Sequence, residues 1–263
     1  MFNTLIEQFK SAQVAAAEAY AAVARAEAQA LPGLEGYMRA TKNRHSYKTE
    51  RELSEFCSNL VGAIVCQASR KFAPVGGRIE IDRSDELDAC AINIGEALKK
   101  GEIPDLDAFW AHLERKFAGE GGVAIAYEQA ARAIIDGFYL KPTSEMKRTG
   151  TGVVIDMSVQ SDARWRGDGM RSISTYASQR VAACFQGLAA FARKAGFDVL
   201  ASELAHGRYL HEDFASRDKL SFTGLDITRF NDKWQCRFAF AVGDALSLFI
   251  SEFGAAYLAS RDR

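Results

Sequence analysis

"FYLKPTSEMKRTGTGVVIDMSV", residues 138–159, is the stretch in which the pattern of apolar residues changes. Before it, apolar residues recur every three or four positions, which is typical of one face of a helix. Within it, Val153, Ile155, Met157 and Val159 alternate with other residues, which predicts a strand. A phosphate-binding loop connects a strand to a following helix, so that the helix N-terminus meets the phosphate. Here the predicted order is helix, loop and strand, so we interpret the stretch as a join between two kinds of structure.

The residues before this join read as a series of amphipathic helices with short connections. We predict helices over residues 3–31, from Thr49 to Phe72, from Asp82 or Ser84 to Gly101, from Pro104 or Asp105 to Gly119, and through Val123 to Phe138. Thr49 and Glu52 have the spacing of a capping box, which marks a helix start. Broad apolar faces and short loops predict a helical bundle over residues 1–141.

The residues after the join mix strands and helices. We predict a strand at 152–159, a helix from about Ser172 to Lys194, a hairpin that turns at Asn231 and Asp232, and a helix over about 244–258. Cys236, Phe238 and Phe240 are expected on one face of the hairpin. Residues 142–263 therefore read as a small unit with about three antiparallel strands. The predicted fold class is α+β and mostly helical.

Composition limits the classes of function. The chain of 263 residues has a formal net charge of −1, so a nucleic-acid contact requires a local basic patch. Its five cysteines are widely spaced, without a CxxC pair, and four of them lie on apolar stripes, so we expect a reducing cytoplasm and no disulfide or zinc site. We expect no signal peptide, because the first residues, "MFNTLIEQFK", lack a basic segment and an uninterrupted apolar stretch. We also expect no membrane-spanning helix, because the sequence has no run of about 18 apolar residues.

Two basic segments are candidate binding surfaces. "YMRATKNRHSYKTER", residues 37–51, carries Arg39, Lys42, Arg44 and Lys48 among aromatic side chains. "DARWRGDGMRS", residues 162–172, carries Arg164, Trp165, Arg166 and Arg171 just before a predicted helix. Cations beside aromatic rings suit phosphate contact and base stacking, and they also suit an acidic protein partner. Charged runs of this kind are also common on solvated loops, and that alternative stays open.

No segment has the spacing of a known catalytic or metal motif. "HGRYLHED" brings His206, His211, Glu212 and Asp213 together, but the two histidines are five residues apart and do not share a helical face. We therefore interpret this segment as chance crowding, while an enzyme built on these four side chains stays as an alternative. We predict no catalytic residues, no metal site and no cofactor.

Three stretches resemble an uncharacterised family from prophages, plasmids and integrative elements. They are "ALKKGEIPDLDAFWAHLERKF", "YEQAARAIIDGFYLKPTSEMKRTGTGVVIDMSV" and "FNDKWQCRFAFAVGDALSLFISEFG", at residues 97–117, 127–159 and 230–254. Members of this family, a domain of unknown function, are often encoded near or joined to DNA methyltransferase modules. The resemblance covers about two thirds of the chain and implies a genomic setting, without catalytic residues to carry over.

These observations lead to an expected function. We expect an accessory protein of a phage or mobile element that acts by binding, with a host anti-phage defence complex as a candidate target. The alternatives are a nucleic-acid-binding module associated with DNA modification, and a nuclease or nucleotide-modifying enzyme. Tyr20, Val23 and Ala24 continue the apolar seam of the first helix, which predicts a homo-oligomer, although Glu27 interrupts that seam.

Overall fold

The computed structural model describes residues 1–33, 41, 46–73, 79–144, 146–164, 169–207 and 212–261, with the side chains of 46 and 47 left out. The chain forms two compact units. Unit 1 consists of residues 1–71 and 81–118, and unit 2 consists of residues 72–80 and 119–263. The sequence predicted a division at residue 141, whereas these units divide after residue 118. The helix that follows residue 118 packs with unit 2, because its small residues face another helix of that unit.

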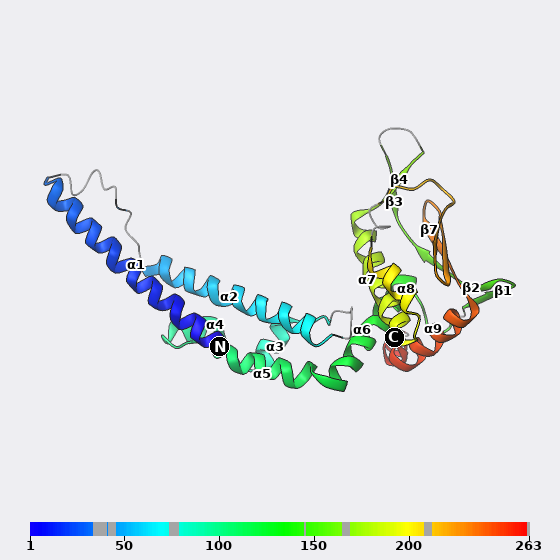
Figure 1. The fold of residues 1–263 in the computed structure, drawn as a ribbon, viewed down its shortest axis with the longest axis horizontal. Helices are drawn as coiled ribbons and strands as arrows, with labels where there is room; N and C mark the ends of the chain where they lie inside the picture. Colours follow the sequence, from blue (N-terminus) through cyan, green and yellow to red (C-terminus); the bar gives the residue numbers. More distant parts are fainter. Residues whose placement is uncertain are drawn as a thin grey trace. The chain divides into compact units, whose positions relative to one another are not determined.

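Unit 1 is helical. It contains α1 (Phe2–Ala30), α2 (Ser46–Lys71), α3 (Arg83–Ala89), α4 (Ile94–Lys99) and α5 (Leu106–Phe117). Helices α1 and α2 run antiparallel beside each other (Figure 1). The rings of Phe9 and Phe56 stack at 4.3 Å between centroids, and the Gln13 side chain donates to the carbonyl of Thr49 at 3.0 Å. Buried apolar side chains of α1, α2 and α5 complete the interior, among them Ile6, Val61, Ile64, Phe109 and Leu113.

The first turn of α1 also caps the start of α5. Asn3 Oδ1 accepts from the backbone N–H groups of Leu106 and Asp107 at 2.8 and 3.2 Å. Asp105, the N-cap of α5, accepts from Ala108 N at 3.0 Å and from the Asn3 side chain at 2.9 Å. The first N–H groups of a helix have no partner within the helix, so these contacts satisfy donors that would otherwise be unpaired.

Two details of unit 1 differ from the sequence prediction. Helix α2 begins at Ser46, three residues before the predicted capping box, so Thr49 lies inside the helix. The helix predicted up to Gly101 is split into α3 and α4. The break occurs at Ala91, whose φ of 54° lies in the left-handed region and ends α3. Asn93 then caps α4 by accepting from Glu96 N at 3.1 Å.

Unit 2 combines a sheet with helices. Its elements are α6 (Gly119–Phe138), β1 (Lys147–Thr149), β2 (Gly152–Ser158), β3 (Ser161–Ala163), β4 (Arg171–Ile173), α7 (Thr175–Lys194), α8 (Asp198–Ala205), β5 (Asp218–Phe222), β6 (Leu225–Arg229), β7 (Lys233–Phe238), α9 (Phe240–Phe253) and α10 (Ala255–Ser260). The α+β class with a mostly helical chain is confirmed. The order helix, loop and strand across residues 138–159 is confirmed as well.

The sheet of unit 2 is larger than the three strands predicted. Five antiparallel strands follow the order β1-β2-β7-β6-β5, and β3 and β4 form a separate pair. The four strands that the sequence did not single out are three to five residues long, too short for a clear alternating pattern. The turn between β6 and β7 falls at residues 230–232, where Asn231 and Asp232 predicted it.

One face of this sheet forms the core of unit 2 with α6, α7 and α9. Val153, Ile155 and Met157 of β2 are buried on this face, as their alternation predicted. Cys236 and Phe238 of β7 share it, but Phe240 is the first residue of α9 and is 41% exposed, so its predicted place on the hairpin is wrong. The helix predicted from about Ser172 begins at Thr175, with Ser174 as its N-cap, and the last predicted helix is divided at Gly254 into α9 and α10.

Helices α6 and α7 approach closely within this core. At Gly187 of α7, an added Cβ would lie only 2.7 Å from the carbonyl oxygen of Ala130 and 3.1 Å from Ile134 Cγ1. Such a distance is shorter than normal van der Waals contact, so the packing requires a residue without a side chain at this position. The same close approach shapes the hollow described below.

Candidate functional site

The first basic segment lies mostly outside the described residues. Arg39, Lys42 and Arg44 belong to residues that the structure does not describe. Lys48 is exposed in the first turn of α2. This segment therefore stays a predicted binding surface, with one side chain placed on the surface of unit 1.

The second basic segment maps onto the hairpin formed by β3 and β4. Trp165 and Arg166 lie outside the described residues. Arg164 forms an ion pair with Asp213, with 2.6 Å between Nη1 and Oδ2. Arg171 is half-buried and donates from Nε to Ser161 Oγ at 2.8 Å and from Nη2 to the Ser161 carbonyl at 2.6 Å. The two arginines that can be placed are thus engaged in holding the hairpin, which reduces their availability to a phosphate.

The histidine-rich segment does not form a site among the described residues. His206 Nδ1 lies 2.7 Å from the carbonyl of Ser202, one turn earlier in α8, and Asp213 pairs with Arg164. Glu212 is exposed, and His211 lies outside the described residues. Within the described part of the chain, no group of three or more His, Cys, Asp or Glu side chains is arranged to hold a metal ion.

The cysteines of unit 2 are buried in its core. Burial is the main cause that raises the pKa of both Cys184 and Cys236, and the proximity of Cys236 adds to the effect on Cys184. In unit 1, burial likewise raises the pKa of Cys57. A thiol must ionise to act as a nucleophile, so these three side chains are suited to packing rather than to covalent chemistry.

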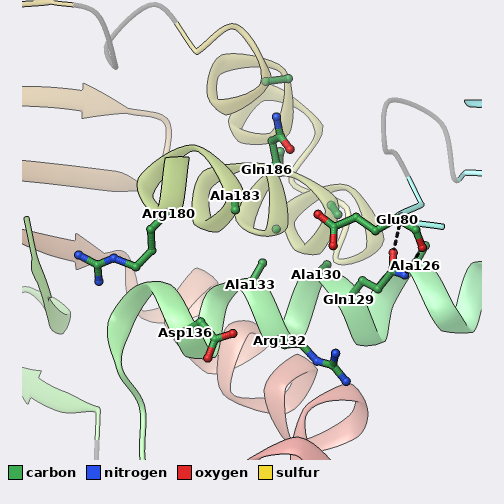
Figure 2. A pocket seen from close by; sticks show the side chains of 14 residues that line it. Glu80, Ala126, Gln129, Ala130, Arg132, Ala133, Asp136, Arg180, Ala183 and Gln186 are labelled. Atoms are coloured by element: carbon green, nitrogen blue, oxygen red, sulfur yellow. Dashed lines mark hydrogen bonds between the residues drawn. The ribbon is translucent and has the colours of Figure 1, made fainter. Parts of the chain in front are cut away.

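A hollow of about 520 Å³ lies between α6, α7 and the end of α8. Figure 2 shows Ala130 and Ala133 of α6 facing Ala183 of α7 across it. Its floor is formed by small side chains, because α6 and α7 pack closely at Gly187. The polar residues that line the hollow are Glu80, Gln129, Arg132, Asp136, Arg180 and Gln186. This volume is in the range of small-molecule sites, but the shape alone does not define a chemistry.

One end of the hollow is closed by a reciprocal pair of hydrogen bonds. The side-chain amide of Gln129 accepts from the backbone N–H of Glu80 at 2.8 Å and donates to the backbone carbonyl of Glu80 at 2.7 Å. In Figure 2 the Glu80 side chain extends from this contact over the hollow. Gln129 therefore attaches the backbone of Glu80 to α6.

The charged rim residues are engaged with other elements. Asp136 accepts from the Tyr257 hydroxyl at 2.9 and 3.0 Å and pairs with Arg261 at 3.1 Å. The guanidinium of Arg132 lies over the ring of Tyr257, with 4.7 Å to the centroid. Arg180 donates to the carbonyls of Gly137 and Ser158. The contacts of Arg132, Asp136 and Arg180 thus stabilise the packing of α6 against α7 and α10.

Sequence reasoning did not single out this hollow. Arg132 and Asp136 are one turn apart on α6, whereas Arg180 is contributed by α7, so only the packing of the two helices brings them together. The signal in the sequence is weak and consists of the alanines spaced along both helices.

Comparison of the chain with protein-family models, with curated proteins and with solved structures finds no match. The resemblance to a family from mobile elements therefore stays a prediction. Of the helices in the described residues, none is both long enough and apolar enough to cross a membrane.

Proposed function

We propose that the protein acts by binding other proteins through helix α1 and that its first partner is a second copy of the same chain. One observation carries the proposal. After Ile6, α1 contains no buried residue, although it continues to Ala30 and carries apolar side chains. Val23 is 57% exposed, and Leu31, which caps the helix, is 45% exposed. Apolar side chains that follow one helical stripe in this way are typical of an interface.

The position of α2 explains the exposure. Phe9 stacks on Phe56 and Gln13 contacts Thr49, which gives the antiparallel register of the two helices. Continued in the same register, the first residue of α2 lies level with about residues 16 to 19 of α1. The second half of α1 therefore extends beyond the start of α2 (Figure 1). We call residues 20–31 the distal part of α1.

The spacing of side chains in α1 supports a second helix as the occupant. Ile6, Phe9, Gln13, Ala16, Tyr20 and Val23 alternate steps of three and four residues, as the core positions of a coiled coil do. Phe9 and Gln13 already contact α2 of the same chain, whereas Val23 lies beyond it. Glu27, the next position of the series, interrupts its apolar character and accepts from the backbone N–H and the hydroxyl of Thr41 at 3.0 and 2.5 Å. A single stripe of this kind is self-complementary in a twofold dimer, because each copy presents the same face.

The cellular role is a further part of the proposal. The genomic setting implied by the resemblance supports an accessory protein of a phage or mobile element, with a host anti-phage defence complex as its target. Five free cysteines support an action in the cytoplasm. The test is to express the chain in bacteria that carry a defined defence system and to measure phage plating. Restored plating supports the role, and unchanged protection against phage across the systems tested contradicts it.

Light scattering tests the binding proposal. We expect a particle heavier than the 28.9 kDa of one chain at micromolar concentration. Val23→Glu should return the mass to that of one chain, because it places a charge in the apolar stripe. Ala22→Glu adds the same charge at an exposed neighbouring position on another face and should leave the mass unchanged. A wild-type mass of one chain, or a Val23→Glu variant that still associates, contradicts the proposal.

A further inference from the structure

Arg229 is a buried cation in the core-facing layer of the sheet of unit 2. It is the last residue of β6 and lies directly opposite Trp234 of β7, so the two side chains share one face of the sheet. Only 5% of Arg229 is exposed. Its guanidinium carbon lies 4.9 Å from the ring centroid of Phe214 and 6.0 Å from that of Trp234. Aromatic rings thus flank this charge, as in other cation–π contacts.

Three of the side-chain nitrogens of Arg229 and Trp234 are unpaired. Among the residues that the structure describes, Arg229 Nε, Arg229 Nη1 and Trp234 Nε1 are buried without a hydrogen-bond acceptor. Together these three nitrogens carry four N–H bonds. Buried side-chain donors are almost always paired in folded proteins, because desolvation without a new hydrogen bond is costly. Two adjacent side chains that both lack acceptors therefore indicate that oxygen atoms from outside the chain complete the site.

The protein compensates the charge of Arg229 only in part. Asp218 Oδ2 lies 3.8 Å from Arg229 Nη2, which is longer than a hydrogen bond, and it already accepts from Ala215 N at 2.8 Å. Desolvation by burial lowers the pKa of Arg229, while the charges of Asp218 and Glu212 act in the opposite direction. Desolvation is the larger of these two effects on the pKa, so an additional negative group beside the guanidinium would stabilise its charged form.

The backbone around Arg229 is held by its neighbours. Arg171 exchanges two backbone hydrogen bonds of 2.9 Å with Phe214, and Arg217 N donates to the carbonyl of Arg229 at 2.7 Å. Arg164 is paired with Asp213, which precedes Phe214. These contacts fix the ring of Phe214 and the strand end beside the buried guanidinium.

We propose that Arg229 and Trp234 form a binding site for a small oxyanion, a phosphate or a carboxylate, whose oxygens accept their unpaired N–H groups. Guanidinium donors match the geometry of both groups, and hydrogen bonds to a charged acceptor are stronger than those to a neutral one. Because only 5% of Arg229 is exposed, the group that reaches it must be small. A free anion, or a small molecule that carries one, meets this condition. This site is separate from α1 and does not depend on the proposed function.

Nuclear magnetic resonance of the indole N–H groups gives a direct test. The three tryptophans of the chain provide three indole signals, and Trp234→Phe assigns the one from the site. Titrating the ¹⁵N-labelled full chain with inorganic phosphate, acetate and a nucleoside monophosphate, at constant ionic strength in chloride, distinguishes the possible sources of the oxyanion. We expect the Trp234 signal to shift in a saturable way with at least one of them, while the other two indole signals stay in place.

Variants link the response to Arg229. Arg229→Gln should weaken the apparent affinity at least tenfold, because it removes the charge and keeps a polar side chain. Arg237→Gln removes an exposed arginine from the opposite face of β7 and should leave the affinity unchanged. No saturable shift of Trp234 with any of the three anions overturns the proposal and leaves water as the partner of these donors. The proposal is also overturned if the Trp234 signal of a folded Arg229→Gln variant responds to the anions as that of the wild type does. The variant is folded if the indole signals of the two tryptophans outside the site keep their wild-type positions.

Discussion

The close approach of α6 and α7 makes a quantitative prediction at Gly187. An alanine there places its Cβ 2.7 Å from the carbonyl oxygen of Ala130, which belongs to the backbone of α6. A rigid helix must move to accommodate the methyl group, and overpacking of this kind costs about 1–3 kcal/mol. Replacing a glycine within a helix by alanine recovers about 0.5–1 kcal/mol of that loss. Subtracting the gain from the cost leaves a loss of about 0–2.5 kcal/mol, and we expect Gly187→Ala to lower the free energy of unfolding by about 1 kcal/mol, near the middle of this range.

Gly62 in α2 is the matched control. An added Cβ at this position meets no heavy atom within 4 Å. Only the gain in helix propensity remains there, so Gly62→Ala should raise the free energy of unfolding by about 0.5–1 kcal/mol. Urea denaturation followed by circular dichroism measures both changes, and the melting temperature of Gly187→Ala should fall by about 2–4 °C. A Gly187→Ala variant at least as stable as the wild type refutes the account of the α6–α7 contact.

Three further predictions concern other parts of the chain. Ala91→Gly relieves a left-handed backbone conformation between α3 and α4 and should raise the free energy of unfolding by up to about 1 kcal/mol in urea denaturation. Asp105→Ala removes the cap of α5 and should lower it by about 1 kcal/mol. Hydrogen bonds from the backbone of Ala108 and the side chain of Asn3 lower the pKa of Asp105 below its ordinary value of 3.8. The stability that the ionised carboxylate contributes is therefore lost as the pH falls below 3.8. In thermal melts, the melting temperature of Asp105→Ala should fall less on acidification than that of the wild type. The hydrogen bond to Asp136 is the main cause that raises the pKa of Tyr257 above 10. The stability of the protein should therefore fall as the pH rises above 10, and it should fall less in Tyr257→Phe. Equal melting curves of the two proteins at alkaline pH would contradict this.

The nucleic-acid alternative can be tested independently of these variants. Fluorescence anisotropy of labelled DNA and RNA, titrated with the protein at two salt concentrations, measures phosphate neutralisation by a basic patch. Because Arg164 and Arg171 are engaged with Asp213 and Ser161, we expect no tight, salt-dependent binding. Binding that weakens steeply with salt and is lost in Lys48→Glu would favour the first basic segment and this alternative function.

Local patterns predicted the elements well where they were long. The helical period of residues 3–31 matches α1 within a residue at each end, and the alternation in β2 places Val153, Ile155 and Met157 in the core. The split between α3 and α4 was missed because Cys90, Ala91 and Ile94 continue an apolar stripe. Nothing in that stripe signals that the backbone of Ala91 adopts a positive φ.

Features that depend on packing between distant residues could not be predicted. Helix α6 reads like the helices before it, and only its small residues opposite Gly187 make it part of unit 2. Arg229 alternates with Leu225 and Ile227 of β6, which places it on their face of the strand, but a charged side chain is rarely buried and the sequence did not single it out. Its burial follows from the register with Trp234 and from the ring of Phe214, which no local pattern shows.

Hydrogen exchange in the distal part of α1 tests the central claim most directly. The amides of residues 20–30 lie in the part of α1 that has no buried side chain, so in a single chain they should open and exchange readily. We expect their exchange, followed by mass spectrometry, to slow as the protein concentration rises through the micromolar range, and we expect Val23→Glu to abolish this dependence. Exchange that is the same at all concentrations would show that α1 is not an interface between copies and would contradict the account.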